Sequence, residues 1–236
     1  MKKILIFFVV LLVGCTSAQI SKTLSTVGSV LNSEELTEGD VAAGLKEALV
    51  NGVNKGSDQA SQVDGFYKDP LLKIPFPPEI EKVETKLRQL GAGKLVDDFV
   101  LSLNRGAEKA AAEAKPIFVD AVKSMTVQDA WGILKGEDNA ATEYLKRTTS
   151  TQLEAKFKPV IKESLDGVGA TKHFSTVVNY YNKIPLIEDV NPNLDDYATQ
   201  KAMEGLFLLI EKEEKNIRED PIARTTDLLK RVFAEQ

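Results

Sequence analysis

Apolar residues recur along this chain at the spacing of an α-helix. Val41, Leu45, Leu49 and Val53 follow one another at four-residue steps, which places one apolar stripe along a single helix. Comparable stripes continue to the C-terminus, and no stretch of useful length alternates apolar and polar residues as a strand does. We therefore predict an all-α fold, in which residues 36–236 form one irregular domain of about eight or nine helices.

Glycine, proline and hydroxyl residues mark the expected helix ends. A helix over 79–90 stops at Gly91, which favours the left-handed conformation of a C-cap. Thr126 and Asp129 have the spacing of a capping box at the start of a short helix. One further helix is expected to start near Gly93 and another at an Asn139 cap. Pro116 either kinks the helix that starts near Gly93 or begins a new helix. The remaining helices are expected over about 149–165, 171–183, 194–217 and 222–234.

The stretch 63–78 interrupts the helical pattern. Its prolines at 70, 75, 77 and 78 deny it a regular helix. It nevertheless carries Phe66, Leu72 and Ile74, whose side chains favour burial. We expect this stretch to lie clamped across the body of the domain.

The N-terminus has the pattern of a bacterial lipoprotein signal. Lys2 and Lys3 precede an apolar run over 4–13, and Cys15 is the only cysteine of the chain. The alternative is a transmembrane anchor, but the run is about half of the roughly 20 residues that a spanning helix needs. A signal that ends at a cysteine is typical of lipoproteins, in which that thiol carries a lipid.

This pattern predicts where the protein is located. Residues 1–14 would be removed, Cys15 would become the lipidation site, and residues 15–35 would tether the domain to the membrane. The residue after the cysteine is Thr16 and not an aspartate, which by resemblance to enterobacterial lipoprotein sorting favours the outer membrane over retention in the inner membrane. We therefore expect a lipid-anchored protein of the bacterial cell envelope, attached to the outer membrane and facing the periplasm.

The composition argues against several classes of binding and catalytic site. The formal net charge of -5 argues against nucleic acid as a partner, because nucleic-acid binding needs clustered positive charge. His173 is the only histidine, whereas a zinc enzyme usually needs two or three. A Ser-His-Asp triad would normally come with a Gly-x-Ser-x-Gly motif, which the sequence lacks. We expect no metal, no cofactor and no catalytic residue.

Short motifs spread over residues 40–233 resemble the bacterial family known as domain of unknown function 4197. They are Gly44-Leu45-Lys46-Glu47-Ala48-Leu49, Asp64-Gly65-Phe66, Ile74-Pro75-Phe76-Pro77-Pro78, Asn104-Arg105-Gly106-Ala107-Glu108, Met125-Thr126, Asp129-Ala130, Ala140-Ala141-Thr142, Gly205-Leu206-Phe207, Ile217-Arg218 and Arg224-Thr225-Thr226-Asp227-Leu228-Leu229. The resemblance implies a secreted or lipid-anchored helical domain. It implies no activity, so no catalytic residue is carried over.

One polar group stands within an otherwise apolar helix. Glu108 lies four residues after Asn104 and three after Arg105, so all three share one broad face. If that face points inward, its charges need partners, and we expect them on the C-terminal helices. The expected partners are Glu211, Glu214, Arg218 and Arg224. The cluster is either an internal site for an anion or polar head group, or an ion-pair network that pins helices together; we favour the network.

Three functions remain open. The first is a non-enzymatic module that binds a partner protein or an envelope component. The second is a carrier of a small apolar or amphipathic ligand, in a cavity lined by Trp131, Phe174, Tyr180 and Tyr181. The third is a carboxylate-based hydrolase of envelope glycans, with Asp129, Asp138 and Glu143 as the nearest acidic group. The poverty of catalytic groups favours the first.

Overall fold

A computed structural model describes residues 37–167, Gly169, 174–176, Asn179, 182–183, 193–220, Lys230 and Val232. The chain divides into two compact units, Met1–Thr37 and Glu38–Gln236, and every element described below belongs to the second. The predicted signal, the Cys15 lipidation site, the tether, His173 and Arg224 lie outside the described residues.

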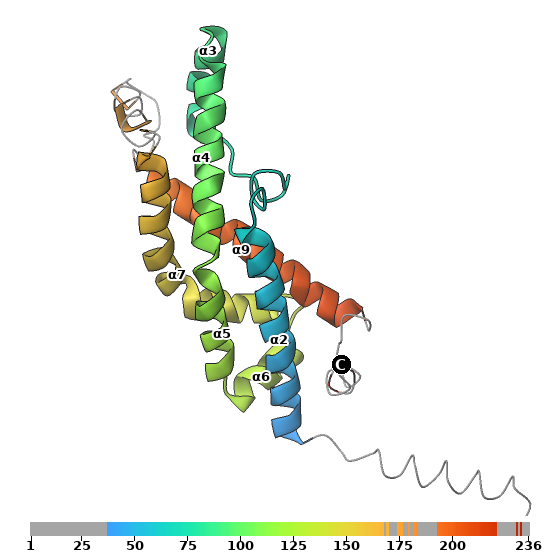
Figure 1. The fold of residues 1–236 in the computed structure, drawn as a ribbon. Coiled ribbons are helices and arrows are strands. Elements are labelled where there is room, and N and C mark those ends of the chain that lie inside the picture. Colours follow the sequence, from blue (N-terminus) through green and yellow to red (C-terminus); the bar gives the residue numbers. More distant parts are fainter. Residues whose placement is uncertain are drawn as a thin grey trace, which may run out of the picture. The chain divides into compact units, whose positions relative to one another are not determined.

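The described residues form helices and no strands, which confirms the predicted all-α fold. In the part of the chain that the structure describes, seven α-helices and one short 3-10 helix follow one another (Figure 1). They are α2 (Glu38–Ser61), η1 (Pro78–Ile80), α3 (Glu81–Gln89), α4 (Gly93–Ala111), α5 (Ala114–Ser124), α6 (Val127–Leu134), α7 (Ala140–Asp166) and α9 (Leu194–Glu219). The helices expected at about 171–183 and 222–234 fall largely outside the described part of the chain.

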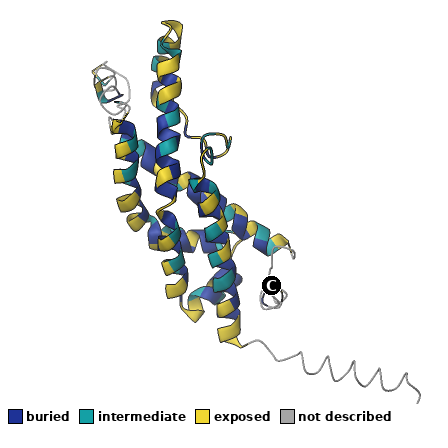
Figure 2. Cartoon of the chain, in the orientation of Figure 1, coloured by how far each residue is buried: buried dark blue, intermediate teal, exposed yellow. Residues whose placement is uncertain are grey.

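The core lies where α2, α4, α7 and α9 meet. Figure 2 shows that the buried faces of these helices turn inward and the exposed faces turn outward. Leu45, Leu103, Leu145, Phe157 and Leu206 contribute side chains that are at most 2% exposed, one or two from each helix. Burial of such side chains is the main stabilising contribution, about 1.5–3 kcal/mol each.

Helices α2 and α9 approach each other closely. A methyl group added at Gly52 would lie 3.4 Å from Ile217 Cδ1, and one at Gly56 would lie 3.5 Å from Ile210 Cγ1. Small residues on one face of α2 therefore let α9 cross it at short range (Figure 1). This contact fixes the middle and the end of α9 on the core.

The irregular connection between α2 and η1, residues 62–77, is clamped as the sequence predicts. Phe66, Leu72 and Ile74 are 0%, 3% and 1% exposed. Phe66 lies against Gly205 of α9, where an added Cβ would approach the Phe66 ring to 2.8 Å. Gly205 is therefore needed to admit the ring. The 62–77 segment is thus part of the core and not a free loop.

Several predicted helix ends are confirmed. Gly91 has a φ of 82°, the left-handed conformation expected after α3. Thr126 and Asp129 form a complete capping box at the start of α6. A break at 112–113 separates α4 from α5, so Pro116 lies in the first turn of a new helix, the second of the two predicted alternatives.

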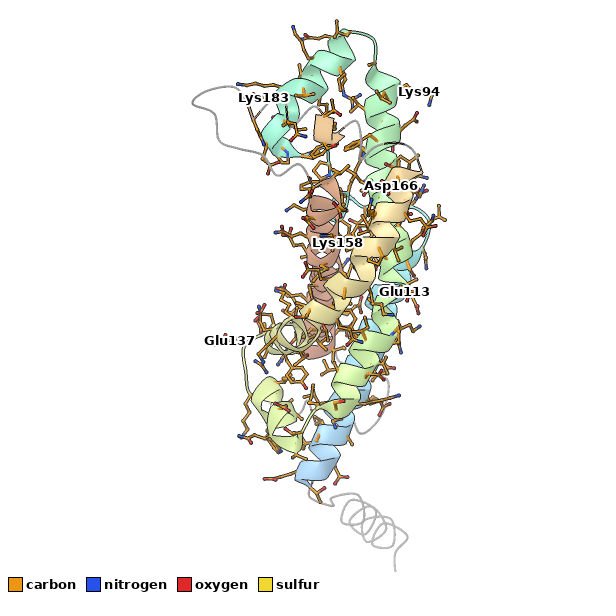
Figure 3. All side chains as sticks on the ribbon, turned by 90° about the vertical axis from the view of Figure 1, so that its left-hand side faces the viewer. Lys94, Glu113, Glu137, Lys158, Asp166 and Lys183 are labelled. Atoms are coloured by element: carbon orange, nitrogen blue, oxygen red, sulfur yellow. The ribbon has the colours of Figure 1, made fainter. Side chains whose placement is uncertain are left out.

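The prediction of two separate helices, one starting at Asn139 and one at about 149–165, is wrong, because α7 runs unbroken over both. The hydroxyl groups of Thr148, Thr149 and Ser150 donate to carbonyls three or four residues earlier, so the polar run continues the helix. Such back-bonding and the interior Pro159 both favour bending. Figures 1 and 3 show α7 bent along its length.

Candidate functional site

Asn104 on α4 holds the 62–77 segment through backbone atoms. Its Oδ1 accepts the Ile74 N–H at 2.9 Å, and its Nδ2 donates to the Ile74 carbonyl at 2.9 Å. The Nδ2 group also donates to the Val100 carbonyl at 2.7 Å, and the residue is 0% exposed. Both functional groups of the amide are thus used within the protein.

The Glu108 cluster, made of Asp64, Arg105 and Glu108, grips the start of the same segment. Glu108 Oε1 accepts the N–H groups of Phe66 and Tyr67 at 3.1 and 3.2 Å. Arg105 donates to Glu108 Oε2 at 2.5 Å and to Asp64 Oδ1 at 2.6 Å. The Arg105 guanidinium also lies 5.7 Å from the centre of the Tyr67 ring.

These contacts shift two ionisation equilibria. Hydrogen bonds from Lys68 and Arg105 lower the pKa of Asp64. Hydrogen bonds to Asp64 and Glu108 raise the pKa of Arg105. Both shifts favour the charged forms, so the ion pairs persist at neutral pH.

The Glu214 cluster, made of Thr142, Glu214 and Arg218, closes the start of α7. Glu214 on α9 accepts the Ala141 N–H at 2.9 Å and the Thr142 N–H and hydroxyl at 2.8 Å each. Arg218 donates to Glu214 Oε1 at 2.9 Å and to the Ile133 carbonyl at 2.9 Å. Glu214 therefore satisfies N–H groups that the first turn of α7 cannot satisfy itself.

This geometry corrects two sequence predictions. The expected pairing of Arg105 and Glu108 with Glu214 and Arg218 is wrong, because each pair belongs to its own cluster. The polar face of α4 meets the 62–77 segment instead of α9. Asn139 precedes α7 as predicted but makes no side-chain cap, because Glu214 supplies the carboxylate from another helix.

Asp64 and Thr142 are the members that the sequence analysis missed. Asp64 stands in the Asp64-Gly65-Phe66 motif and has a positive φ of 70°. Thr142 stands in the Ala140-Ala141-Thr142 motif. The motifs marked both positions, but no spacing rule joined them to their partners 41 and 72 residues away.

The pocket that borders the Glu214 cluster is too small for a ligand. The pocket beside Glu214 and Arg218 has a volume of about 10 Å³. That is at most room for about one water molecule. The side chains of Glu108 and Glu214 are 4% and 3% exposed, so both carboxylates lie within the fold.

Asp129 is also occupied structurally. Its carboxylate accepts the Thr126 N–H at 2.9 Å and the Thr126 hydroxyl at 2.6 Å. The two hydrogen bonds lower the pKa of Asp129. Among the described residues, no group of three or more His, Cys, Asp or Glu side chains has the arrangement of a metal site.

The aromatic residues proposed for a ligand cavity have different surroundings. Phe174 is 5% exposed and stacks on Phe99 with ring centres 6.2 Å apart. Trp131 has the Lys135 ammonium 4.8 Å from its ring centre. Tyr180 and Tyr181 lie outside the described residues. Phe174 thus extends the core.

A groove of about 810 Å³ runs between α7 and α9 and is open to solvent. We call it the α7–α9 groove. The helices are antiparallel here, because Thr142 meets Glu214 at one end and Lys158 meets Asp196 at the other. The lining residues are Lys146, Ser150, Glu154 and Lys158 of α7, and Asp196, Thr199, Gln200, Met203, Glu204, Phe207, Leu208 and Glu211 of α9. In Figure 3, Lys158 marks the end of the groove farther from the start of α7.

The charges of the α7–α9 groove are only partly neutralised. Lys158 bonds Asp196 across the groove, an interaction that raises the pKa of Lys158. Glu204 pairs with Lys201 at 2.7 Å. Within the described part of the chain, Glu154 and Glu211 have no ion pair. The groove therefore presents an excess of negative charge.

Apolar and polar groups lie together on the α9 wall and floor. Leu208 is 41% exposed, whereas its neighbour in sequence, Phe207, is 5% exposed. Thr199 is 3% exposed, and its hydroxyl has no hydrogen-bond partner among the described residues. An orphan hydroxyl costs stability unless something satisfies it. The α9 side of the groove thus combines an exposed apolar side chain with a polar group that has no partner among the described residues.

None of the described helices is long and apolar enough to cross a membrane. Searches of curated proteins and of solved structures each return no match to this chain. Residues 35–234, a range that contains all the described helices, match the family described as protein of unknown function (DUF4197). The resemblance seen in the motifs is thereby confirmed, and the chain belongs to the DUF4197 family.

Proposed function

We propose that this protein is a lipid-anchored, non-enzymatic binding module of the bacterial envelope, and that the α7–α9 groove receives its partner. The observation that carries the proposal is the contrast between buried and exposed charge. Backbone groups of the protein itself are hydrogen-bond partners of the buried side chains of Asn104, Glu108 and Glu214. Glu154 and Glu211 instead face a groove of about 810 Å³. That volume is within the usual range of about 300–1,000 Å³ for binding sites.

Site-specific photocrosslinking in cells tests the groove. A photoreactive phenylalanine derivative is introduced at Leu208, which lines the groove and is 41% exposed. The matched control is Val127 on α6, an apolar residue that is 42% exposed and does not line the groove. We expect one reproducible adduct from Leu208 and none of the same mass from Val127. Equal adducts from both positions would remove the support for binding through the groove.

The anchor is tested separately. Cys15→Ala should leave the protein soluble or unprocessed, because the residue expected to carry the lipid is absent. Fractionation of outer and inner membranes gives the readout. Normal attachment of Cys15→Ala to the outer membrane would show that the anchoring proposal is wrong.

A ligand carrier is the second candidate, because the groove volume also suits a small amphipathic molecule. Mass spectrometry of protein extracted from native membranes would then detect a stoichiometric ligand. A hydrolase has weaker support, since Asp129 is held in a capping box. Digestion of peptidoglycan or envelope glycans that is lost on substitution of a single carboxylate would replace the binding proposal.

A further inference from the structure

We infer that the α7–α9 groove binds a cationic amphipathic helix of a partner protein. The inference rests on the proposed binding role of the groove and adds the chemistry of what binds there. It follows from the length of the groove, its charge and the position of its apolar surface.

The length of the groove suits a short helix. On α7 the lining residues extend from Lys146 to Lys158, and on α9 they extend from Asp196 to Glu211. At a rise of about 1.5 Å per residue these walls are about 18 and 22 Å long. A helix of about 12–15 residues has the same length. A helix that lays one face into a groove between two others is a common mode of recognition.

The charge of the groove requires basic residues on the incoming helix. Lys146 pairs with Glu143, and Lys158 with Asp196, so the two lysines of the lining have carboxylates of their own. Glu154 on α7 interacts with Lys158 only at longer range than an ion pair, and Glu211 on α9 forms no ion pair with a described residue. A helix with a cation on each flank of its apolar face would pair with both walls.

The apolar part of the groove determines which face of the incoming helix packs against α9. Met203, Phe207 and Leu208 lie on α9 within five positions of one another, about one and a half turns. Leu208 projects most, at 41% exposed. Leucines at helical spacing on the incoming helix would cover it and remove apolar area from water.

A fluorescent peptide of about 14 residues serves as the probe. It has leucines at positions i, i+3, i+4 and i+7 and lysines on both flanks of that face; a second peptide carries glutamates in place of the lysines. Fluorescence anisotropy measures binding of each to the full-length protein purified in detergent. We expect saturable binding of the lysine peptide, and binding of the glutamate peptide weaker by about tenfold or more.

The decisive comparison is between two double variants that have the same net charge. The double variant Glu154→Gln/Glu211→Gln removes the two groove carboxylates, and we expect it to weaken lysine-peptide binding about tenfold. The control Glu137→Gln/Glu163→Gln removes two exposed carboxylates that do not line the groove, and its dissociation constant should stay within about twofold. Equal losses in both doubles would mean general charge attraction and would overturn the inference.

Apolar contact is tested with a second matched pair. Leu208→Asn should weaken lysine-peptide binding about fivefold, whereas Val127→Asn, at 42% exposed on α6, should leave it unchanged. Circular dichroism melts of all variants establish that they are folded. Equal binding by Leu208→Asn and the unsubstituted protein would contradict the proposed apolar contact.

The outcomes separate this inference from the proposed function. If the photoreactive group at Leu208 captures a partner in cells while neither peptide binds, the groove binds something other than a cationic helix and the inference is wrong. If the glutamate peptide binds as tightly as the lysine peptide, the assigned charge preference is wrong. If Leu208 yields no specific adduct and no peptide binds, both proposals fail.

Discussion

Glu108 and Glu214 make the same set of interactions in different parts of the fold. Each is a buried carboxylate that accepts two backbone N–H groups from a distant segment and pairs with an arginine on its own helix. Glu108 holds the irregular 62–77 segment, whereas Glu214 holds the first turn of α7. The arginines differ most, because the Arg105 side chain is 32% exposed and that of Arg218 is 9% exposed.

The comparison indicates that the burial of the paired arginine decides how much stability is lost when the carboxylate is removed. Water can solvate Arg105 if Glu108 is removed, so much of the penalty is relieved. Arg218 has much less access to water. Glu214 also lies at a helix N-terminus, where the helix dipole favours a negative charge. The Glu214 cluster should therefore contribute more to global stability than the Glu108 cluster.

The largest expected effect is that of Glu214→Gln. The substitution removes the buried carboxylate that pairs with the 9% exposed Arg218, and it turns an amide donor toward the N–H groups of α7. We expect the free energy of unfolding to fall by about 3–5 kcal/mol, measured by urea denaturation. Glu211→Gln, on the same helix but without an ion pair to a described residue, is the control and should change it by less than about 0.5 kcal/mol. Equal losses in Glu214→Gln and Glu211→Gln would contradict the special contribution of the Glu214 cluster to stability.

Glu108→Gln should lower the free energy of unfolding by less, about 2 kcal/mol. The reason is that Arg105 keeps its ion pair with Asp64 and is partly hydrated. Its effect should also be local. Hydrogen exchange of the Phe66 and Tyr67 amides should accelerate far more than exchange in α7 or α9. If α7 were released as strongly as the 62–77 segment, the two clusters would not be independent.

Thr142→Val tests the Glu214 cluster without removing a charge. The variant keeps the shape of the side chain but loses the 2.8 Å hydroxyl bond to Glu214. We expect a loss of about 1 kcal/mol in urea denaturation, because the two N–H bonds and Arg218 remain. A loss as large as that of Glu214→Gln would mean that the hydroxyl, and not the ion pair, dominates the cluster.

The smallest effect is one of pH on the Glu108 cluster. The pKa of Asp64 is lowered in the folded protein, so its stabilising contribution is present above the ordinary carboxyl pKa of about 3.9 and is lost as the pH falls through the lower folded value. Exchange at Phe66 and Tyr67 should accelerate over that acidic range. Asp64→Asn should remove this part of the pH dependence; an unchanged profile would assign it to another carboxylate.

Features encoded by neighbours in sequence were predictable. The stripe from Val41 to Val53, the capping box at Thr126 and the turn at Gly91 each depend on residues within one or two helical turns. The burial of the 62–77 segment was predictable as well, because prolines excluded a helix while apolar residues required burial.

The partners in the two clusters were not predictable. Asn104 and Glu108 were singled out as polar residues on one face of an apolar helix, but their partners are backbone groups, which every residue possesses. The cap of α7 was assigned to the adjacent Asn139, whereas the structure takes it from Glu214, 73 residues from Ala141. The α7–α9 groove escaped notice because ordinary surface residues form it once two distant helices lie antiparallel.

The cap that Glu214 supplies to α7 has a consequence for the order in which the protein folds. A chain that emerges from its N-terminus first exposes Ala141 and Thr142 long before Glu214 has been made. Until α9 arrives, the first turn of α7 lacks its acceptor and the surface of α2 that receives α9 stays uncovered. The native fold of the described residues is therefore completed only late in synthesis, after α9 has been made.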